Sequence, residues 1–380
     1  MKSFFQFLGR AFKYFRGTKR VWRKPPRADL LIIDRGTASP LDEMFAHHNP
    51  HIMDIRGESV NMLALLRAVP KIHLGAVAYL EAYIDFVKPK LILSRTDNNA
   101  TLWQLKRRPH STYKVALIQN GWRLDLEFEM PMLLGSAGRH NQWFVDQVFA
   151  YGPTWPAQIA RTTRANSVAA GSLLCNSISW KASSGQSQTI ALVSTFRPGY
   201  LKNQLDLGLQ LYSGLNKYLT QSSRKLLVIG FSGPDRIIEE SRFIKKHFTT
   251  VDWSIESREN RMSSYENLRL VDVVLVDQSS LGYEMLGVGK RVGFIAAMEW
   301  CRQTHRFGLP LEFGEKGPFW TNDPSEEEIG RILDYLLTVS DEQWERDSGW
   351  IRDQLMVHDY GNTKIRAYVE GVLTGSLKSN

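Results

Sequence analysis

The chain has 380 residues, of which 43% are hydrophobic and 23% charged, so it is a globular protein too long for a single hydrophobic core. Its formal net charge of +9 comes almost entirely from residues 1–24, which hold eight Lys or Arg and no acid; 9 − 8 leaves +1 for the remainder. The nearly neutral body does not indicate a nucleic-acid partner. The two cysteines, Cys175 and Cys301, fit neither a disulfide framework nor a zinc site, and no apolar run is long enough to span a membrane.

The basic start, residues 1–26, predicts an amphipathic helix. Its apolar face consists of Phe4, Leu8, Ala11, Phe12 and Phe15, and its cationic side holds Arg10, Lys13 and Arg16. Aromatic and cationic faces together are typical of a helix that lies in a membrane interface. We therefore expect a cytoplasmic protein held on the anionic inner face of the cytoplasmic membrane through residues 1–24. A disordered tail, or a helix docked on its own domain or on a partner, is the alternative.

Strand-like and helical patterns alternate through the first half of the chain, which is typical of βαβ units and a parallel sheet. The predicted strands are 29–34, 51–55, 90–94, 114–119, 147–152 and 167–171, and the predicted helices lie near 58–68, 71–87, 98–107 and 153–164. The polar, small-residue stretch 180–188 then predicts a linker.

A second series of the same kind follows the linker. Its predicted strands are 189–195, 225–231, 251–255, 271–277 and 291–296, with helices near 202–221, 235–247 and 280–288. The expected fold class is α/β, with two Rossmann-like domains, 27–180 and 181–340, facing a central cleft. The C-terminal stretch 341–380, helical over about 341–373, is expected to pack back on the first domain.

Ligands of open α/β sheets bind beyond the carboxyl ends of the strands. The stretch "DQSSLGYEMLGVGKRV" (277–292) follows such a strand and begins a helix, whose free amides favour a phosphate. Asp277, Ser279 and Ser280 are donor-binding candidates, and Glu284, one turn on, is placed to accept hydrogen bonds from ribose hydroxyls. Helix capping by one serine is the simpler reading of the same residues.

Six motifs occur in order: "KPKLILSRTDNN" (88–99), "LIQNGWR" (117–123), "GSLLCN" (171–176), "SSLGYEML" with "GK" (279–290), "GPFW" (317–320) and "HDYGN" (358–362). In these motifs and their order the chain resembles bacterial surface-carbohydrate (O-antigen or capsule) biosynthesis proteins of the GT-B glycosyltransferase type. The resemblance implies a GT-B fold and transfer of a sugar from a nucleotide-activated donor to a lipid-linked or oligosaccharide acceptor. It implies no cofactor and no metal, which agrees with the lack of metal-binding motifs and of ligand spacing among the nine histidines.

Further candidates follow the strand ends. On the donor side these are Ser194 and Thr195, with Arg197 near the leaving phosphate. The acceptor-side candidates are Arg56, Asn61, Asn98, Gln119, Asn120 and Arg123. Asp97, which we prefer, or Glu58 is the expected base in an inverting reaction, whereas in a retaining reaction these carboxylates would carry a covalent sugar. The structural alternatives are helix starts at Asp97 and Glu58, a turn at Asn120 and a surface position for Arg197.

Three other functions fit the same pattern. A sugar-nucleotide epimerase shares the double Rossmann plan, and a polyol-phosphate transferase shares a serine-rich donor loop and a basic tail. A non-catalytic scaffold of polysaccharide assembly would keep the folds without needing Asp97, Arg197 or Glu284.

Overall fold

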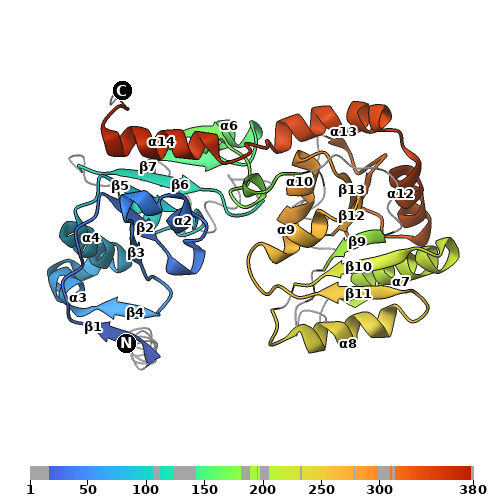
Figure 1. Ribbon diagram of the computed structural model, residues 1–380, viewed down its shortest axis with the longest axis horizontal. Helices are drawn as coiled ribbons and strands as arrows, with labels where there is room; N and C mark the ends of the chain where they lie inside the picture. The colour runs from blue at the N-terminus through green and yellow to red at the C-terminus, as the bar shows by residue number, and fades with distance from the viewer. Residues whose placement is uncertain are drawn as a thin grey trace.

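The computed structural model describes residues 17–105, 112–122, 143–180, 189–194, 196, 205–231, 233–277, 279–297, 309 and 313–377. Two largely parallel β-sheets lie side by side, each with helices packed on it (Figure 1). The expected fold class, α/β with two Rossmann-like units, is confirmed. Within the described ranges, no helix is long and apolar enough to cross a membrane.

The first sheet has six parallel strands in the order β3-β2-β5-β6-β7-β8. They are β2 (Leu30–Ile33), β3 (His51–Met53), β5 (Leu91–Ser94), β6 (Lys114–Ile118), β7 (Phe144–Ala150) and β8 (Arg164–Ala169). Each of the six predicted strands overlaps one of these. Strands β2 and β5 are buried at every position, because helices cover both faces of the sheet.

The helices of this unit are α2 (Leu41–Met44), α3 (Met62–Ala68), α4 (Ala76–Val87) and α6 (Thr154–Thr162). Three of the predicted helices differ from the structure. The helix expected at 58–68 begins at Met62, and the one expected at 71–87 is broken at Gly75, where φ is 57°. The one expected at 98–107 is reduced to a 3-10 turn at Leu102–Gln104 within the described residues, because the Asn99 side chain accepts a hydrogen bond from the Thr101 amide.

The end of the basic start belongs to the first unit. Strand β1 (Lys19–Val21) pairs in parallel with β4 (Ser59–Asn61). The side-chain amide of Asn61 also donates to the carbonyl of Arg23, at 2.8 Å. Within the basic start, residues 1–26, for which we expected an amphipathic helix, residues 19–21 therefore form a strand, because they pair with β4. Residues 1–16, with the apolar face of the expected helix, lie outside the described residues.

The second sheet has the order β11-β10-β9-β12-β13-β15-β14, with only β14 antiparallel to its neighbour. Its strands are β9 (Thr189–Val193), β10 (Lys225–Ile229), β11 (Trp253–Glu256), β12 (Val273–Val276), β13 (Arg291–Ile295), β14 (Lys316–Gly317) and β15 (Trp320–Thr321). Its helices are α7 (Leu205–Ser222), α8 (Ile237–His247), α9 (Ser263–Leu268), α10 (Ser280–Gly287) and α12 (Glu326–Thr338). The strand order reverses between β9 and β12, which is where open α/β sheets bind nucleotides.

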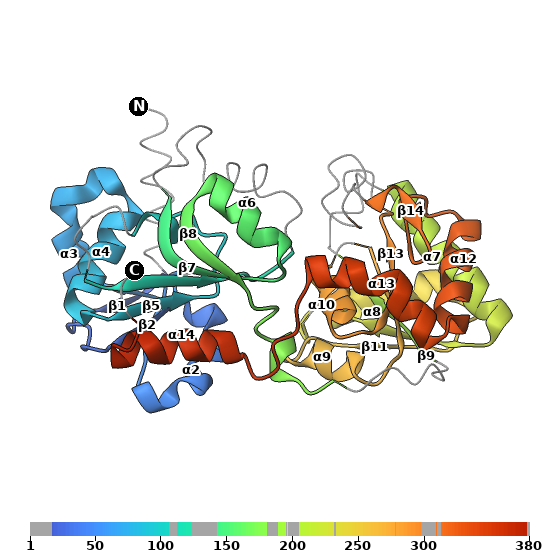
Figure 2. The same cartoon turned by 90° about the horizontal axis from the view of Figure 1, so that it is seen from above.

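The C-terminal stretch forms two helices, rather than the single one expected. Helix α13 (Asp341–Leu355) packs beside α10 in the second unit, and α14 (Thr363–Thr374) lies on the first sheet (Figures 1 and 2). Ile365, Val369 and Leu373 of α14 join a buried cluster with residues of β2 and β5. The chain therefore crosses between the two units a second time, at residues 356–362.

Two sequence motifs hold this second crossing. The Asn176 side chain of "GSLLCN" donates to the side-chain oxygen of Asn362 of "HDYGN", at 3.1 Å, and accepts from the Asp359 amide, at 3.0 Å. Asn362 is almost fully buried, with φ of 57°. A side chain at Gly171 would collide with the carbonyl of Val357, so the crossing segment lies directly on the backbone of the first unit.

Candidate functional site

A cavity of about 280 Å³ lies between the carboxyl ends of the two sheets. The first unit contributes Arg95, which follows β5, and Asn120, which follows β6. The second unit contributes residues that follow β9, β10, β11 and β12, together with helix α9. The principal ones are Ser194, Gly230, Arg258, Arg261, Tyr265, Ser279, Ser280 and Glu284. The cavity thus lies at the carboxyl ends of β9 and β12, where the strand order of the second sheet reverses, and it faces the first sheet.

The cavity wall is cationic. Arg95, Arg258 and Arg261 line it, and none of the three forms an ion pair with another residue of the described ranges. Burial, together with the nearby charge of Arg95, lowers the pKa of Arg261. Repulsion of this kind is relieved when an anion binds, so the geometry favours a negatively charged ligand.

Glu284 is the only described carboxylate that lines this cavity, and it is nearly inaccessible to solvent, at 3% exposure. Its side-chain oxygens accept hydrogen bonds from the hydroxyls of Tyr265, at 2.7 Å, and Tyr151, at 3.4 Å. Burial raises the pKa of the Glu284 carboxyl, although the Tyr265 hydroxyl opposes the shift. Burial also raises the pKa of both tyrosines, which therefore remain hydrogen-bond donors.

The two serines at the start of α10 have different roles. Ser279 is the N-cap, and its hydroxyl accepts from the Leu281 amide, at 3.3 Å. The Ser280 hydroxyl instead accepts from the backbone amide of Trp122 in the first unit, at 2.8 Å. The rings of Trp122 and Tyr283 stack at 3.7 Å, so α10 is both a wall of the cavity and a point of contact between the two units.

The first-unit candidates from neighbouring strand ends do come together. Asn120 lines the cavity, and its backbone amide donates to a carboxylate oxygen of Asp97, at 3.2 Å. Asp97 is 6% exposed and is not among the residues that line the cavity. Gln119 is satisfied by its own unit, since its side chain accepts from the Tyr151 amide and donates to the Gly121 carbonyl.

The candidates of the segment 56–61 lie elsewhere. The Arg56 guanidinium binds the fully buried Asp34, at 2.6 Å, and Glu58 is exposed and accepts from the Arg56 amide. Asn61 caps α3. Neither Arg56, Glu58 nor Asn61 lines the cavity, and Asn98, which is exposed, does not line it either.

Of the donor-side candidates, Ser194 lines the cavity, whereas Asp277 is buried and accepts from the Ala297 amide. Thr195, Arg197 and Arg123 lie outside the described residues. Sequence reasoning missed the three cavity arginines and the two tyrosines around Glu284. Arg95 carried a usable signal, because it directly follows the strand "LILS".

The buried Glu284 makes stability depend on pH. Between the ordinary pKa of glutamate and its raised value in the folded protein, the folded state holds a proton that the unfolded state has lost, so stability falls as pH rises. We expect the free energy of unfolding of the native chain to fall relative to Glu284→Gln as the pH rises above about 4.5, by at most about 1.4 kcal/mol per pH unit. Urea unfolding at a series of pH values measures it, and parallel pH profiles would contradict the assignment.

Solved structures with a similar fold cover nearly the whole chain. S. aureus MnaA in complex with UDP has 13% identity and a TM-score of 0.55, covering 96% of this chain and 99% of that one. The wall teichoic acid polymerase TagF soaked with CDPG has 10% identity and a TM-score of 0.54, covering 93% and 91%. The Methanocaldococcus jannaschii UDP-GlcNAc 2-epimerase with UDP-GlcNAc and UDP has 10% identity and a TM-score of 0.53, covering 90% and 99%. At these identities the likeness shows a shared GT-B-like fold.

A search of curated proteins gave no match. A family model described as "putative O-antigen biosynthesis protein" matches residues 116–372, which is more than half of the chain and includes Asn120, α10 and the crossing segment. The chain therefore belongs to this family of O-antigen biosynthesis proteins.

Proposed function

We propose that this protein is a metal-independent glycosyltransferase that moves a sugar from a nucleotide-activated donor to a lipid-linked or oligosaccharide acceptor during surface-polysaccharide assembly. The observation that carries the proposal is the cleft cavity, which is lined by Arg95, Arg258 and Arg261 together with the start of α10 and the buried Glu284. Three cations and a helix N-terminus suit the two phosphates of a nucleoside diphosphate. A fixed buried carboxylate suits the hydroxyls of its ribose.

In the proposed reaction the acceptor hydroxyl attacks the anomeric carbon of the donor sugar. Its proton passes to a carboxylate of the first unit, the new glycosidic bond forms and the bond to the diphosphate breaks. The nucleoside diphosphate leaves with the bonding electrons, and the three arginines stabilise the charge that develops on it. Asp97 remains our proposed base, since it contacts the Asn120 amide at the cavity edge; Arg197 and Thr195 remain proposed donor contacts.

The fold also supports two alternative functions, that of a sugar-nucleotide epimerase and that of a polyol-phosphate transferase. MnaA and TagF share the fold, and their structures contain UDP and CDPG respectively. An epimerase would turn over a UDP-sugar without an acceptor, and a polyol-phosphate transferase would respond to CDP-linked polyols. Binding to a panel of CDP-, UDP-, GDP-, dTDP- and CMP-linked compounds identifies a polyol-phosphate transferase by its CDP-polyol response, and a scaffold would bind none of them. Turnover of a responding UDP-sugar without acceptor separates an epimerase from a glycosyltransferase.

Nucleotide binding should depend on the cavity arginines. We expect one class of nucleotide from this panel to raise the melting temperature of the full chain. At a ligand concentration of 100 times the dissociation constant, binding adds about 2.7 kcal/mol to the free energy of unfolding. Arg95→Ala and Arg261→Ala should each weaken binding at least about tenfold, because each removes a charge-assisted contact. Arg346→Ala, an exposed arginine on α13, is the matched control. If no nucleotide shifts the melting temperature, the proposal fails.

The role of Asp97 can be separated from its hydrogen bond. Asp97→Asn keeps an oxygen that accepts from the Asn120 amide but removes the base. We expect transfer to fall by about 10² to 10⁴-fold while nucleotide affinity stays within about threefold. Transfer assays with the responding donor and calorimetric titration provide the two readouts. Unchanged transfer would show that Asp97 only positions Asn120.

We also propose that the protein attaches to an anionic membrane through its basic start. Lys19 and Arg20 are exposed on β1, and Trp22 is 62% exposed directly after it. Leu66 on the adjacent α3 and Val69, which follows it, are exposed as well. Basic and apolar side chains are thus exposed on and beside β1, close in sequence to the basic residues 1–16, and interfacial binding requires both kinds.

Vesicle flotation tests this attachment. The full chain should float with anionic vesicles and not with neutral ones, because each Lys or Arg near the surface adds about 1 kcal/mol. Deletion of residues 2–16, which leaves β1 intact, should abolish flotation, and Trp22→Ser should weaken it. Trp350→Ser, which changes another exposed tryptophan, in the second unit, should have no effect. Equal flotation of the deletion and the full chain would exclude this role.

A further inference from the structure

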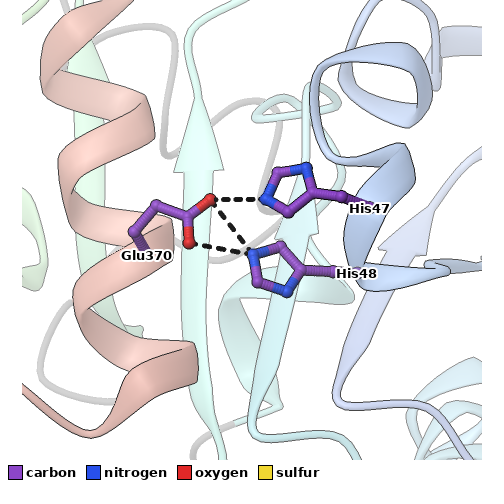
Figure 3. A group of neighbouring side chains, drawn as sticks. All are labelled: His47, His48 and Glu370. Carbon is purple, nitrogen blue, oxygen red and sulfur yellow. Dashed lines mark hydrogen bonds and ion pairs between the residues drawn. The ribbon is translucent and has the colours of Figure 1, made fainter.

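Outside the cleft, three metal-ligating side chains converge from opposite ends of the chain (Figure 3). His47 and His48 lie in the 3-10 helix Ala46–His48, and Glu370 lies on α14. One oxygen of Glu370 is 3.0 Å from the Nε2 atoms of both histidines, and its other oxygen is 3.0 Å from that of His48. We propose that these three residues bind a divalent first-row transition metal ion, with zinc as the probe.

The backbone on both sides of the cluster is firmly held. Phe45, just before the two histidines, and Val369, just before Glu370, are fully buried in the same hydrophobic cluster. The Arg366 guanidinium of α14 also donates to the carbonyl of Met44, at 3.3 Å. The three side chains are therefore presented by packed elements rather than by free loops, which favours a site of defined geometry.

The spacing of the ligand atoms suits a metal. A tetrahedral ion with bonds of about 2.0–2.1 Å separates its ligand atoms by about 3.3 Å. The imidazole-to-carboxylate distances are 3.0 Å, and one ligand atom from each residue lies within 4.8 Å of the others. Small side-chain rotations would place three ligands around one ion and leave the fourth position to water.

The chemistry of the set points the same way. Two imidazoles and one carboxylate are ligands that zinc and nickel accept readily. The side chains of His47 and Glu370 are substantially exposed, which gives an ion access from solvent.

The ion would act on the fold rather than on the transfer reaction. None of the three residues lines the cleft cavity. His47 and Glu370 are 323 positions apart in the sequence, so one ion would fasten the C-terminal helix to the beginning of the first unit. It would thereby fix the end of the segment that crosses between the units. Inspection of the histidines alone gave no ligand spacing, because the third ligand comes from the far end of the chain.

Zinc titration of the full chain, prepared without a polyhistidine tag and freed of metal with a chelator, tests the proposal. In competition with a chromophoric chelator, we expect one zinc ion per chain and a higher melting temperature with zinc. His48→Gln and Glu370→Gln should each weaken binding at least about tenfold and remove the thermal shift, since each removes a direct ligand. His247→Gln, on α8, is the control and should behave as the native chain.

Equal melting temperatures of all variants in chelator would show that the substitutions leave the fold intact. If they differ, the zinc-induced shift is measured against each variant's own chelated value. Binding well below one ion per chain, or equal affinity in the native chain and both ligand variants, would mean that the cluster is an ion pair only and would overturn the proposal. Nucleotide affinity, with and without zinc, should be the same, so this outcome is independent of the transferase assignment.

Discussion

The second crossing of the chain between the two units, at residues 356–362, is fixed to the first unit by buried polar side chains and so constrains how the units face each other. Its path depends on the buried pair Asn176 and Asn362, and on Gly171, where no side chain fits. Because α13 belongs to the second unit and α14 to the first, the segment between them sets the position of one relative to the other. In that position Asn120 of the first unit and α10 of the second line the same cavity.

The cleft itself combines features that cost stability. Its arginines repel one another, and the carboxyl of Glu284 is raised in pKa by burial. In an empty site neither feature contributes to folding, and each is relieved when a ligand supplies negative charge or hydroxyl groups. Such concentration of unfavourable electrostatics in one place is typical of functional sites. The hydrophobic clusters under the two sheets must offset this cost.

Much of the fold could be predicted from the sequence because apolar strands buried on both faces, such as Leu91–Ser94, differ clearly from amphipathic helices. The prediction of a helix at 58–68 was wrong for residues 59–61, because these residues form β4 and pair with β1. At the site, strand-end reasoning found Asn120, Ser194, Ser279, Ser280 and Glu284. It could not find Arg258 or Arg261, because they lie in a loop whose approach to the cleft depends on the packing of whole units.

Helix α10 has two roles that share the same few residues. Ser280 and Tyr283 join the second unit to Trp122 of the first, while Ser279 and Glu284 line the cavity. A residue of α10 that contacts the first unit must fit the surface of that unit, whatever molecule the cavity binds. Relatives that share this architecture but use different donors should therefore keep the run from Ser279 to Glu284 and diverge in the loop that carries Arg258 and Arg261. Donor specificity would then change through the loop that carries Arg258 and Arg261, while the contact of α10 with the first unit stays the same.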